Sequence, residues 1–311
     1  MKVSTLAPQL RKLNRLPSSD FKEWWFFDTN CLSYLVKQHL AGKSDQIKRF
    51  LENAAVLVTS SNIHELSRSN KKLVDNLFET LKSTLTCFIP DITNYWKYES
   101  ESFLNLCKPG ENILQLSHLS EELINRICNN AELEKAISVS DEFLNEEYFN
   151  VISSDIGAPL DERDIRVHIF SIIQKFIKES YNEDLQPKFC TYSNFPSYYS
   201  HLYTYYCHYV KQPNIKAEVN DFIDIGNAIV APYCKYFFTE SKLASTLKNR
   251  VQKLTPPNYY SVVKKTNKKI PLKGSVIKEA KKIRDSSPAE RPLLEKTIVY
   301  EYSNLVNKIE G

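Results

Sequence analysis

Four carboxylates lie either directly after predicted strands or on the helices next to these strands. Because the carboxyl ends of parallel strands meet at one edge of a sheet, side chains placed in this way are expected to converge there. Carboxylate oxygens held on rigid elements are the ligands that Mg²⁺ and Mn²⁺ prefer. The pattern therefore predicts a divalent-metal site, with Mg²⁺ or Mn²⁺ as the cofactor. The four acids are Asp28, Glu65, Asp224 and Glu240.

A site of this kind suits the hydrolysis of phosphodiester bonds, in which a metal polarises the phosphate and activates the attacking water. Asp221 lies three residues before Asp224, on the same helical face, and is a further candidate ligand. The small residues that follow, Gly226 and Ala228, favour Asp224 as the anchored position, but Asp221 remains an alternative or additional ligand. Neighbouring polar side chains are expected to orient ligands or to cap helices. They are Asn30, Asn220 and Thr239.

The segments that carry the first two acids have the pattern of alternating strands and helices. Trp24–Phe27 is a run of bulky apolar residues, as in a strand that is covered on both faces. Apolar residues at helical spacing follow, then the strand Ala55–Thr59, a helix with Glu65, and the strand Leu85–Ile89. The alternation predicts an α/β fold around a central parallel sheet.

The rest of the chain contains long segments with helical patterns. From about residue 90 to 213 these patterns predict a large helical insertion. A helix over Ile215–Pro232 and the strand Lys235–Phe238 then return to the sheet, and Pro256-Pro257 marks a boundary. We therefore expect one α/β domain over residues 1–255, followed by a basic, helical C-terminal extension over residues 256–311. The helices of this extension are expected around Val276–Ile283 and Leu293–Asn307.

Composition narrows the class of protein. The apolar share of 42% is enough to form a core, and the seven scattered cysteines suggest reduced thiols, since their spacing fits neither a disulfide framework nor a zinc site. The sequence contains no apolar run long enough to cross a membrane, so a cytoplasmic protein without membrane association is expected. Residues 253–284 contain nine lysines and one arginine, and we expect a cluster there to contact phosphates. The cluster comprises Lys264, Lys265, Lys268 and Lys269.

With these residues in view, the chain resembles the PIN-domain nuclease family. Phe27-Asp28-Thr29-Asn30 matches the opening motif of that family, and Thr239-Glu240 matches its closing Thr-acid pair, where Asp is commoner than Glu. The resemblance covers roughly the first ninety residues and residues 214–248. It implies a PIN-like α/β/α sandwich and a metal-dependent nuclease, with RNA favoured over DNA as substrate. The implied metal ligands are Asp28, Glu65, Asp224 and Glu240.

Two other functions are compatible with the sequence. One is a catalytically weakened PIN-like domain that binds RNA or protein as an adaptor, which the longer Glu240 side chain would suit. The other is a phosphatase with Asp28 as nucleophile, although Asn30 stands where such an enzyme has a second Asp. Both the active nuclease and the weakened PIN-like adaptor are compatible with a homo-oligomer or with an inhibitory protein partner. If Asp28 is only one of several clustered carboxylates, Asp28→Asn should leave stability unchanged or slightly raised.

Overall fold

A single six-stranded sheet organises the part of the chain that the computed structural model describes, namely residues 23–107, 115, 117–129, 162–192, 194–205, 225–248 and 298–310. Across the sheet the strand order is β4-β3-β2-β1-β5-β6. All neighbouring pairs are parallel except β3 and β4. The strands are β1 (Glu23–Phe27), β2 (Ala54–Thr59), β3 (Leu85–Ile89), β4 (Ser117–His118), β5 (Tyr236–Thr239) and β6 (Ile298–Glu301).

The central strand β1 is buried on both faces, as its unbroken apolar sequence predicts. Phe26 belongs to one hydrophobic core and Phe27 to the other, because successive side chains of a strand point to opposite faces. Each stacks on its partner in β5, Phe26 on Phe237 and Phe27 on Phe238, with ring centroids 5.0 and 4.6 Å apart. The predicted α/β class is confirmed. The sheet is mixed rather than wholly parallel, because the short β4 pairs antiparallel with β3.

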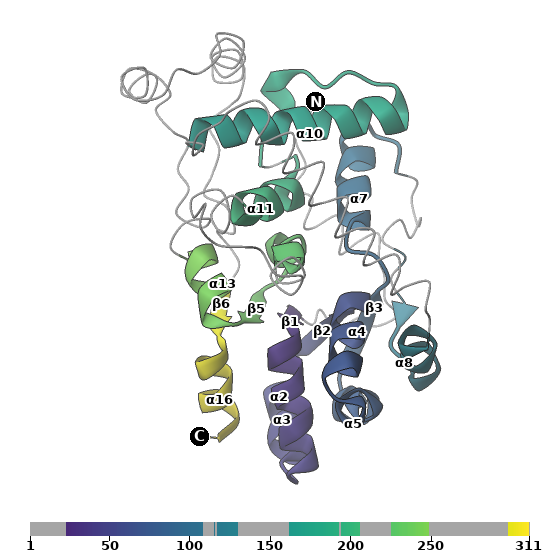
Figure 1. Cartoon of the computed structure of the whole chain (residues 1–311), viewed down its shortest axis with the longest axis vertical. Coiled ribbons are helices and arrows are strands. Elements are labelled where there is room, and N and C mark those ends of the chain that lie inside the picture. Colours follow the sequence, from purple (N-terminus) through teal and green to yellow (C-terminus); the bar gives the residue numbers. More distant parts are fainter. Residues whose placement is uncertain are drawn as a thin grey trace.

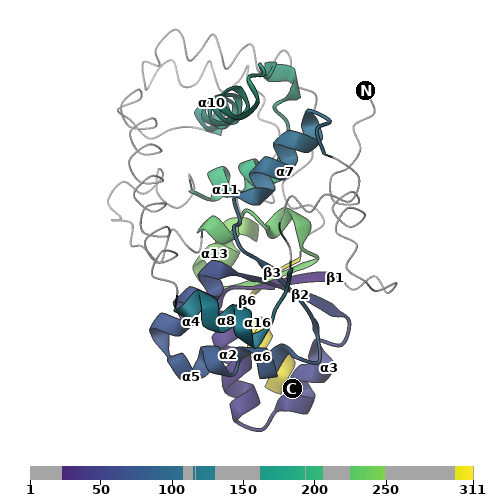
Figure 2. The same cartoon turned by 90° about the vertical axis from the view of Figure 1, so that its right-hand side faces the viewer.

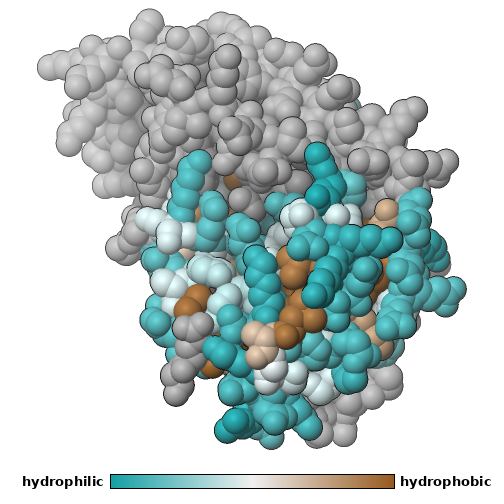
Figure 3. Space-filling model, turned by 60° about the horizontal axis from the view of Figure 1, so that its bottom comes forward, coloured by the Kyte–Doolittle hydropathy of each residue, from teal (hydrophilic) through white to brown (hydrophobic). Residues whose placement is uncertain are grey.

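One face of the sheet is covered by helices from the first half of the chain, together with the last helix (Figures 1 and 2). Their apolar stripes pack on Val56, Val58 and Phe88. Seen from this side, the surface is mainly hydrophilic with small apolar patches (Figure 3). These helices are α2 (Thr29–Leu40), α3 (Ser44–Phe50), α4 (Ser60–Ser69), α5 (Lys71–Asp75), α6 (Leu77–Leu81), α8 (Glu121–Cys128) and α16 (Tyr302–Glu310).

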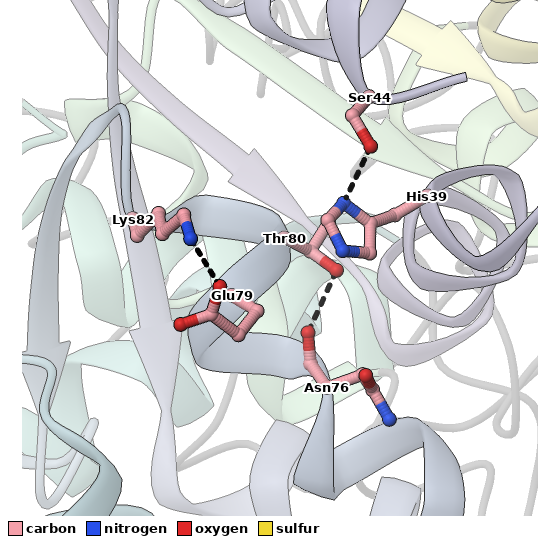
Figure 4. A network of polar contacts seen from close by, with 6 residues as sticks. All are labelled: His39, Ser44, Asn76, Glu79, Thr80 and Lys82. Carbon is pink, nitrogen blue, oxygen red and sulfur yellow. Dashed lines mark hydrogen bonds and ion pairs between the residues drawn. The ribbon is translucent and has the colours of Figure 1, made fainter. Parts of the chain in front are cut away.

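Short polar contacts fix the connections on this side of the molecule (Figure 4). The Oγ of Ser44 lies 3.1 Å from Nδ1 of His39, across the turn between α2 and α3. Thr80 donates its hydroxyl proton to the carbonyl of Asn76, between α5 and α6. These contacts are local and do not reach the carboxyl edge of the sheet, where Asp28 follows β1 and Glu240 follows β5.

The other face is covered by helices that come mainly from the predicted insertion (Figures 1 and 2). The tyrosines of α11 that lie in the core include Tyr198 and Tyr199, at most 1% exposed, so they act in packing rather than as an open base-stacking surface. In the described residues no helix is long and apolar enough to span a membrane. The elements on this face are α7 (Asn94–Phe103), α10 (Glu162–Tyr181), η1 (Pro187–Phe189), α11 (Pro196–Tyr205), η3 (Ala231–Tyr233) and α13 (Ser241–Thr246).

Two sequence-based expectations about the outer parts of the fold need correction. The expected insertion over residues 90–213 is not purely helical, since β4 lies within it and joins the sheet, and α8 packs on the opposite face from α11. The expected helix Leu293–Asn307 is a strand followed by a helix, β6 and α16. Strand β6 pairs with β5, so the end of the predicted extension is part of the sheet. The predicted helix Val276–Ile283 lies outside the described residues.

The packing of α16 predicts that the C-terminal segment contributes to the stability of the whole domain. Leu305 of α16 is fully buried in the core that contains Phe238. Leu305→Ala is expected to lower the free energy of unfolding by about 2–5 kcal/mol, measured by urea denaturation. Asn307→Ala, at an exposed position of the same helix, is the control and should change it by less than about 0.5 kcal/mol. Equal, small effects of both substitutions would show that α16 does not belong to the cooperative core.

Candidate acidic site

The strand order reverses between β1 and β5, and the switch point outside the carboxyl ends of these two strands is called the crevice. From β1 the chain builds outward through β2 and β3, and it later returns to the other side of β1 to add β5 and β6. In open α/β sheets, ligands bind outside the carboxyl ends of the two strands where the order reverses in this way. Asp28 directly follows β1 and Glu240 directly follows β5, so the two acids flank this point.

The carboxylate of Asp28 joins the elements at this point. Its Oδ1 accepts a hydrogen bond from the backbone N–H of Cys31 at 2.8 Å and so caps the N-terminus of α2. Its Oδ2 accepts from the backbone N–H of Glu240 at 2.9 Å. The side chain is 1% exposed. Each carboxylate oxygen has two lone pairs, so both bonds leave acceptor capacity for a cation.

Glu65 lies close enough to the other two acids to feel their charges. Burial is the largest cause that raises its pKa above the ordinary 4.5, and the carboxylates of Asp28 and Glu240 raise it further. A side-chain hydrogen bond with Thr29 and the charge of Arg68 act in the opposite direction. The Oε2 of Glu65 is buried without a hydrogen-bond partner. A half-buried carboxylate near two others, with an unused buried oxygen, fits a site that a cation would stabilise.

The polar groups beneath these acids form a short chain of hydrogen bonds. Thr59, at the end of β2, caps α4, and Asn62 completes a capping box with it. The Nδ2 of Asn62 donates to Oγ1 of Thr29 at 3.3 Å, and Thr29 in turn bonds to Glu65. The start of α2 and the first turns of α4 are thereby held in a fixed relation, which sets the distance between Asp28 and Glu65.

The far side of the crevice contains an acid that the sequence reasoning missed. Glu301 ends β6 and pairs in register with Thr239, whose Oγ1 is buried without a hydrogen-bond partner. The Oε2 of Glu301 lies 3.3 Å from Oγ of Ser241, the first residue of α13, and its Oε1 lies 3.6 Å from Nζ of Lys248. The missed signal was an acid after a short apolar run, Ile298–Tyr300, within a segment whose spacing looked helical.

The other predicted site residues fall into two groups. Asn30 is exposed and lies in the first turn of α2, where Asp28 rather than Asn30 is the cap. The remaining predicted residues lie outside the described part of the chain, and so their placement stays a prediction. They are Asn220, Asp221, Asp224, Lys264, Lys265, Lys268 and Lys269.

The acids of the described residues do not form a complete metal-binding group on their own. Among these residues, no three His, Cys, Asp or Glu side chains are grouped so that they could hold a metal ion. The charges of Asp28 and Glu240 nevertheless act on Glu65, and the chemistry of these acids, with the unpartnered oxygens of Glu65 and Thr239, fits a hard cation. A complete site would need a further oxygen ligand or a small movement of the carboxylates.

Comparison with protein-family models, with curated proteins and with solved structures gives no match for this chain.

The hydrogen bonds of Asp28 change the outcome that the sequence alone suggests for its substitution. Asp28→Asn replaces one acceptor oxygen with an NH₂ group, which leaves a buried backbone N–H without an acceptor. We expect the free energy of unfolding, measured by urea denaturation without metal, to fall by about 1–3 kcal/mol. In the control Asp91→Asn, the exposed side chain uses only Oδ1 for both of its hydrogen bonds, with Thr93, so Asn can keep them. An unchanged stability of Asp28→Asn would mean that charge repulsion dominates at this position.

The raised pKa of Glu65 predicts a specific pH dependence of stability. Because its pKa is higher in the folded than in the unfolded chain, the folded state holds a proton that the unfolded state has lost. The unfolding free energy should therefore fall as pH rises from about 4.5 through the folded-state pKa, and Glu65→Gln should lack this fall. Urea denaturation between pH 4 and pH 8 measures the difference, with Glu52→Gln at an exposed position as control. Parallel curves for the wild type and Glu65→Gln would contradict the proposed coupling.

Proposed function

We propose that this protein is a PIN-like, divalent-metal-dependent nuclease that hydrolyses phosphodiester bonds, with RNA as the favoured substrate. The observation that carries the proposal is the placement of Asp28 and Glu240 on either side of the β1–β5 crevice, with Glu65 coupled to both. Acids from three separate elements lie within electrostatic range of one another's charge at the edge where open α/β sheets bind ligands, with Glu65 affected by both of the others. The finer description as a PIN-like α/β/α sandwich is part of the same proposal, supported by the motif residues and by helices on both faces of the sheet.

The residues have distinct roles in the proposed reaction. Asp28, Glu65 and Glu240 would hold Mg²⁺ or Mn²⁺, and Asp224, with Asp221 as an additional candidate, would supply the further oxygen. The bound ion would polarise the phosphate and lower the pKa of a water molecule. Thr29 and Asn62 keep Asp28 and Glu65 in register, and the backbone N–H groups at the start of α2 favour negative charge at this edge. Asn220, Thr239 and the lysine cluster of residues 264–269 would orient ligands and contact the phosphates of the substrate.

Two observations favour a second function, an RNA- or protein-binding adaptor without catalysis. Both oxygens of Asp28 already bind backbone N–H groups, and the described acids lack a metal-holding group of three. In that case Asp28 serves to join α2 to β5, and the crevice binds its partner without cutting it. The two functions differ in whether the protein responds to Mn²⁺.

The decisive experiment measures cleavage and metal response on the same protein. We expect the full chain to cleave single-stranded RNA of mixed sequence in the presence of Mn²⁺ or Mg²⁺ but not with excess EDTA, and Mn²⁺ to raise its melting temperature. Glu65→Gln should reduce the cleavage rate by about 10–100-fold while the protein stays folded. Glu122→Gln, at an exposed position of α8, is the control and should cleave like the wild type.

The result also separates the two candidate functions. RNA binding without cleavage, together with a melting temperature that is the same with Mn²⁺ and with EDTA, would support the adaptor. Cleavage that persists in EDTA or in Glu65→Gln would exclude the proposed metal site as the source of the activity.

A further inference from the structure

Glu99 is a buried acid on the face of the sheet that α7, α10 and α11 cover, outside the acidic site. It lies on α7 and is fully buried. Its Oε1 accepts two hydrogen bonds, one from the backbone N–H of Ser197 at 2.6 Å and one from the hydroxyl of Tyr233 at 2.5 Å. Its Oε2 is buried without a hydrogen-bond partner. One carboxyl group thus connects three elements, α7, α11 and η3.

The contacts around Glu99 all lead to the segment Ile225–Cys234. Ser197, bound to Glu99 through its backbone, uses its Oγ to donate to the carbonyl of Ile229 at 2.8 Å. The ring of Tyr95, one turn before Glu99, stacks on Tyr233 with centroids 4.9 Å apart. At the start of the segment Gly226 approaches the loop before α7 so closely that an added Cβ would lie 3.3 Å from Cδ1 of Ile92. Helices α7 and α11 therefore hold this segment at several points.

This segment lies between two of the acids assigned to the proposed site. Asp224 immediately precedes Ile225 in the sequence, and Glu240 follows Tyr233 by seven residues (240 − 233). At the other end the backbone N–H of Lys235 donates to the carbonyl of Trp24 at 2.8 Å, which attaches the segment to β1 just before β5 begins. A shift of Ile225–Cys234 would therefore move the start of β5, the strand that Glu240 directly follows.

The surroundings of Glu99 explain how an acid can accept these hydrogen bonds inside a hydrophobic core. Burial raises its pKa to about 8, although the hydrogen bonds from Tyr233 and Ser197 act to lower it. The titratable groups that interact with it electrostatically are the phenols of Tyr95 and Tyr98 from α7 and of Tyr233 from η3, whose own pKa values are raised by burial. His201 of α11 has a pKa lowered to about 4 by burial and is neutral. Burial therefore favours the neutral, protonated carboxyl group, and glutamine is its closest uncharged mimic.

We propose that Glu99 is a positioning residue for the acidic site, which through Tyr233 and Ser197 fixes the segment Ile225–Cys234 and thereby the start of β5 and the acid that follows this strand, Glu240. The positioning of metal ligands rests on the proposed function. The anchoring of the segment does not, because it concerns the hydrogen bonds of Glu99 alone.

The test compares two substitutions of Glu99 in the full chain by amide hydrogen exchange and by calorimetric titration with MnCl₂. Glu99→Leu removes the acceptor, and we expect the amides of Ile225–Thr239 to exchange at least about 10-fold faster while those of β2 do not change. The Kd for Mn²⁺ should rise by about 10–100-fold. Glu99→Gln keeps the acceptor oxygen and should retain both properties. The control Glu101→Leu, on the same helix, removes a side chain whose contacts are with Lys97 and Tyr181, and it should change neither.

Each outcome decides the proposal. Unchanged exchange of Ile225–Thr239 in Glu99→Leu overturns the anchoring role, and faster exchange with an unaltered Kd for Mn²⁺ overturns the positioning role. If Glu99→Leu does not fold, Tyr233→Phe removes only one of the two hydrogen bonds and should give the same changes at smaller size, and its failure to do so overturns the proposal. If the wild-type protein binds no Mn²⁺, the proposed function fails, and exchange alone then supports or overturns the anchoring.

Discussion

The buried carboxylate of Asp28 is the contact on which the geometry of the crevice depends. It is bound to the first turn of α2 on one oxygen and to the backbone at the end of β5 on the other, so it fixes where the helix starts and where the strand stops. The N–H of Asp28 itself continues the ladder, since it donates to the carbonyl of Phe238 at 3.0 Å. Because Asp28 uses a different oxygen for each of these two hydrogen bonds, its side chain must be an acceptor at both ends, which among side chains of this size means a carboxylate. Structure and proposed chemistry therefore favour the same residue.

The sequence allowed the central strands to be predicted because each is an apolar run bounded by polar residues. The run at residues 85–89 follows this rule, as do the runs at 24–27 and 235–238, each of which is soon followed by an acid. The structure has strands at all three places. The pairing of β1 with β5 could only be inferred, since the contact between Asp28 and Glu240 spans 212 residues. Strand β4 has two residues and no pattern of its own. The apolar residues around β6 fit helical spacing as well as strand spacing, and pairing with β5, a tertiary effect, decides between them.

The acids of the site illustrate the same limit. The position of Glu65 after a buried strand was enough to propose it as a ligand, but its coupling to Asp28 depends on Thr29 and Asn62, whose side chains meet only in the folded chain. Glu301 was not predicted as a site residue because its strand was not predicted. Glu99 gave no signal at all, since one Glu in a helix with Lys97 and Glu101 nearby looks solvent-exposed until the packing of α11 and η3 is known.

The late arrival of β5 in the chain has a consequence for the protein during its synthesis. When the ribosome has made β1, β2 and β3, these can pair with one another, but the other edge of β1 stays open until residues 236–239 emerge. An unpaired edge in the middle of a future sheet exposes backbone N–H and C=O groups together with Phe26 and Phe27, and such edges invite association with other chains. In the same interval Asp28 lacks the N–H of Glu240. A nascent chain therefore has neither a closed sheet nor an assembled crevice until residue 240 has been translated, and Asp28 and Glu240 come together only after that point.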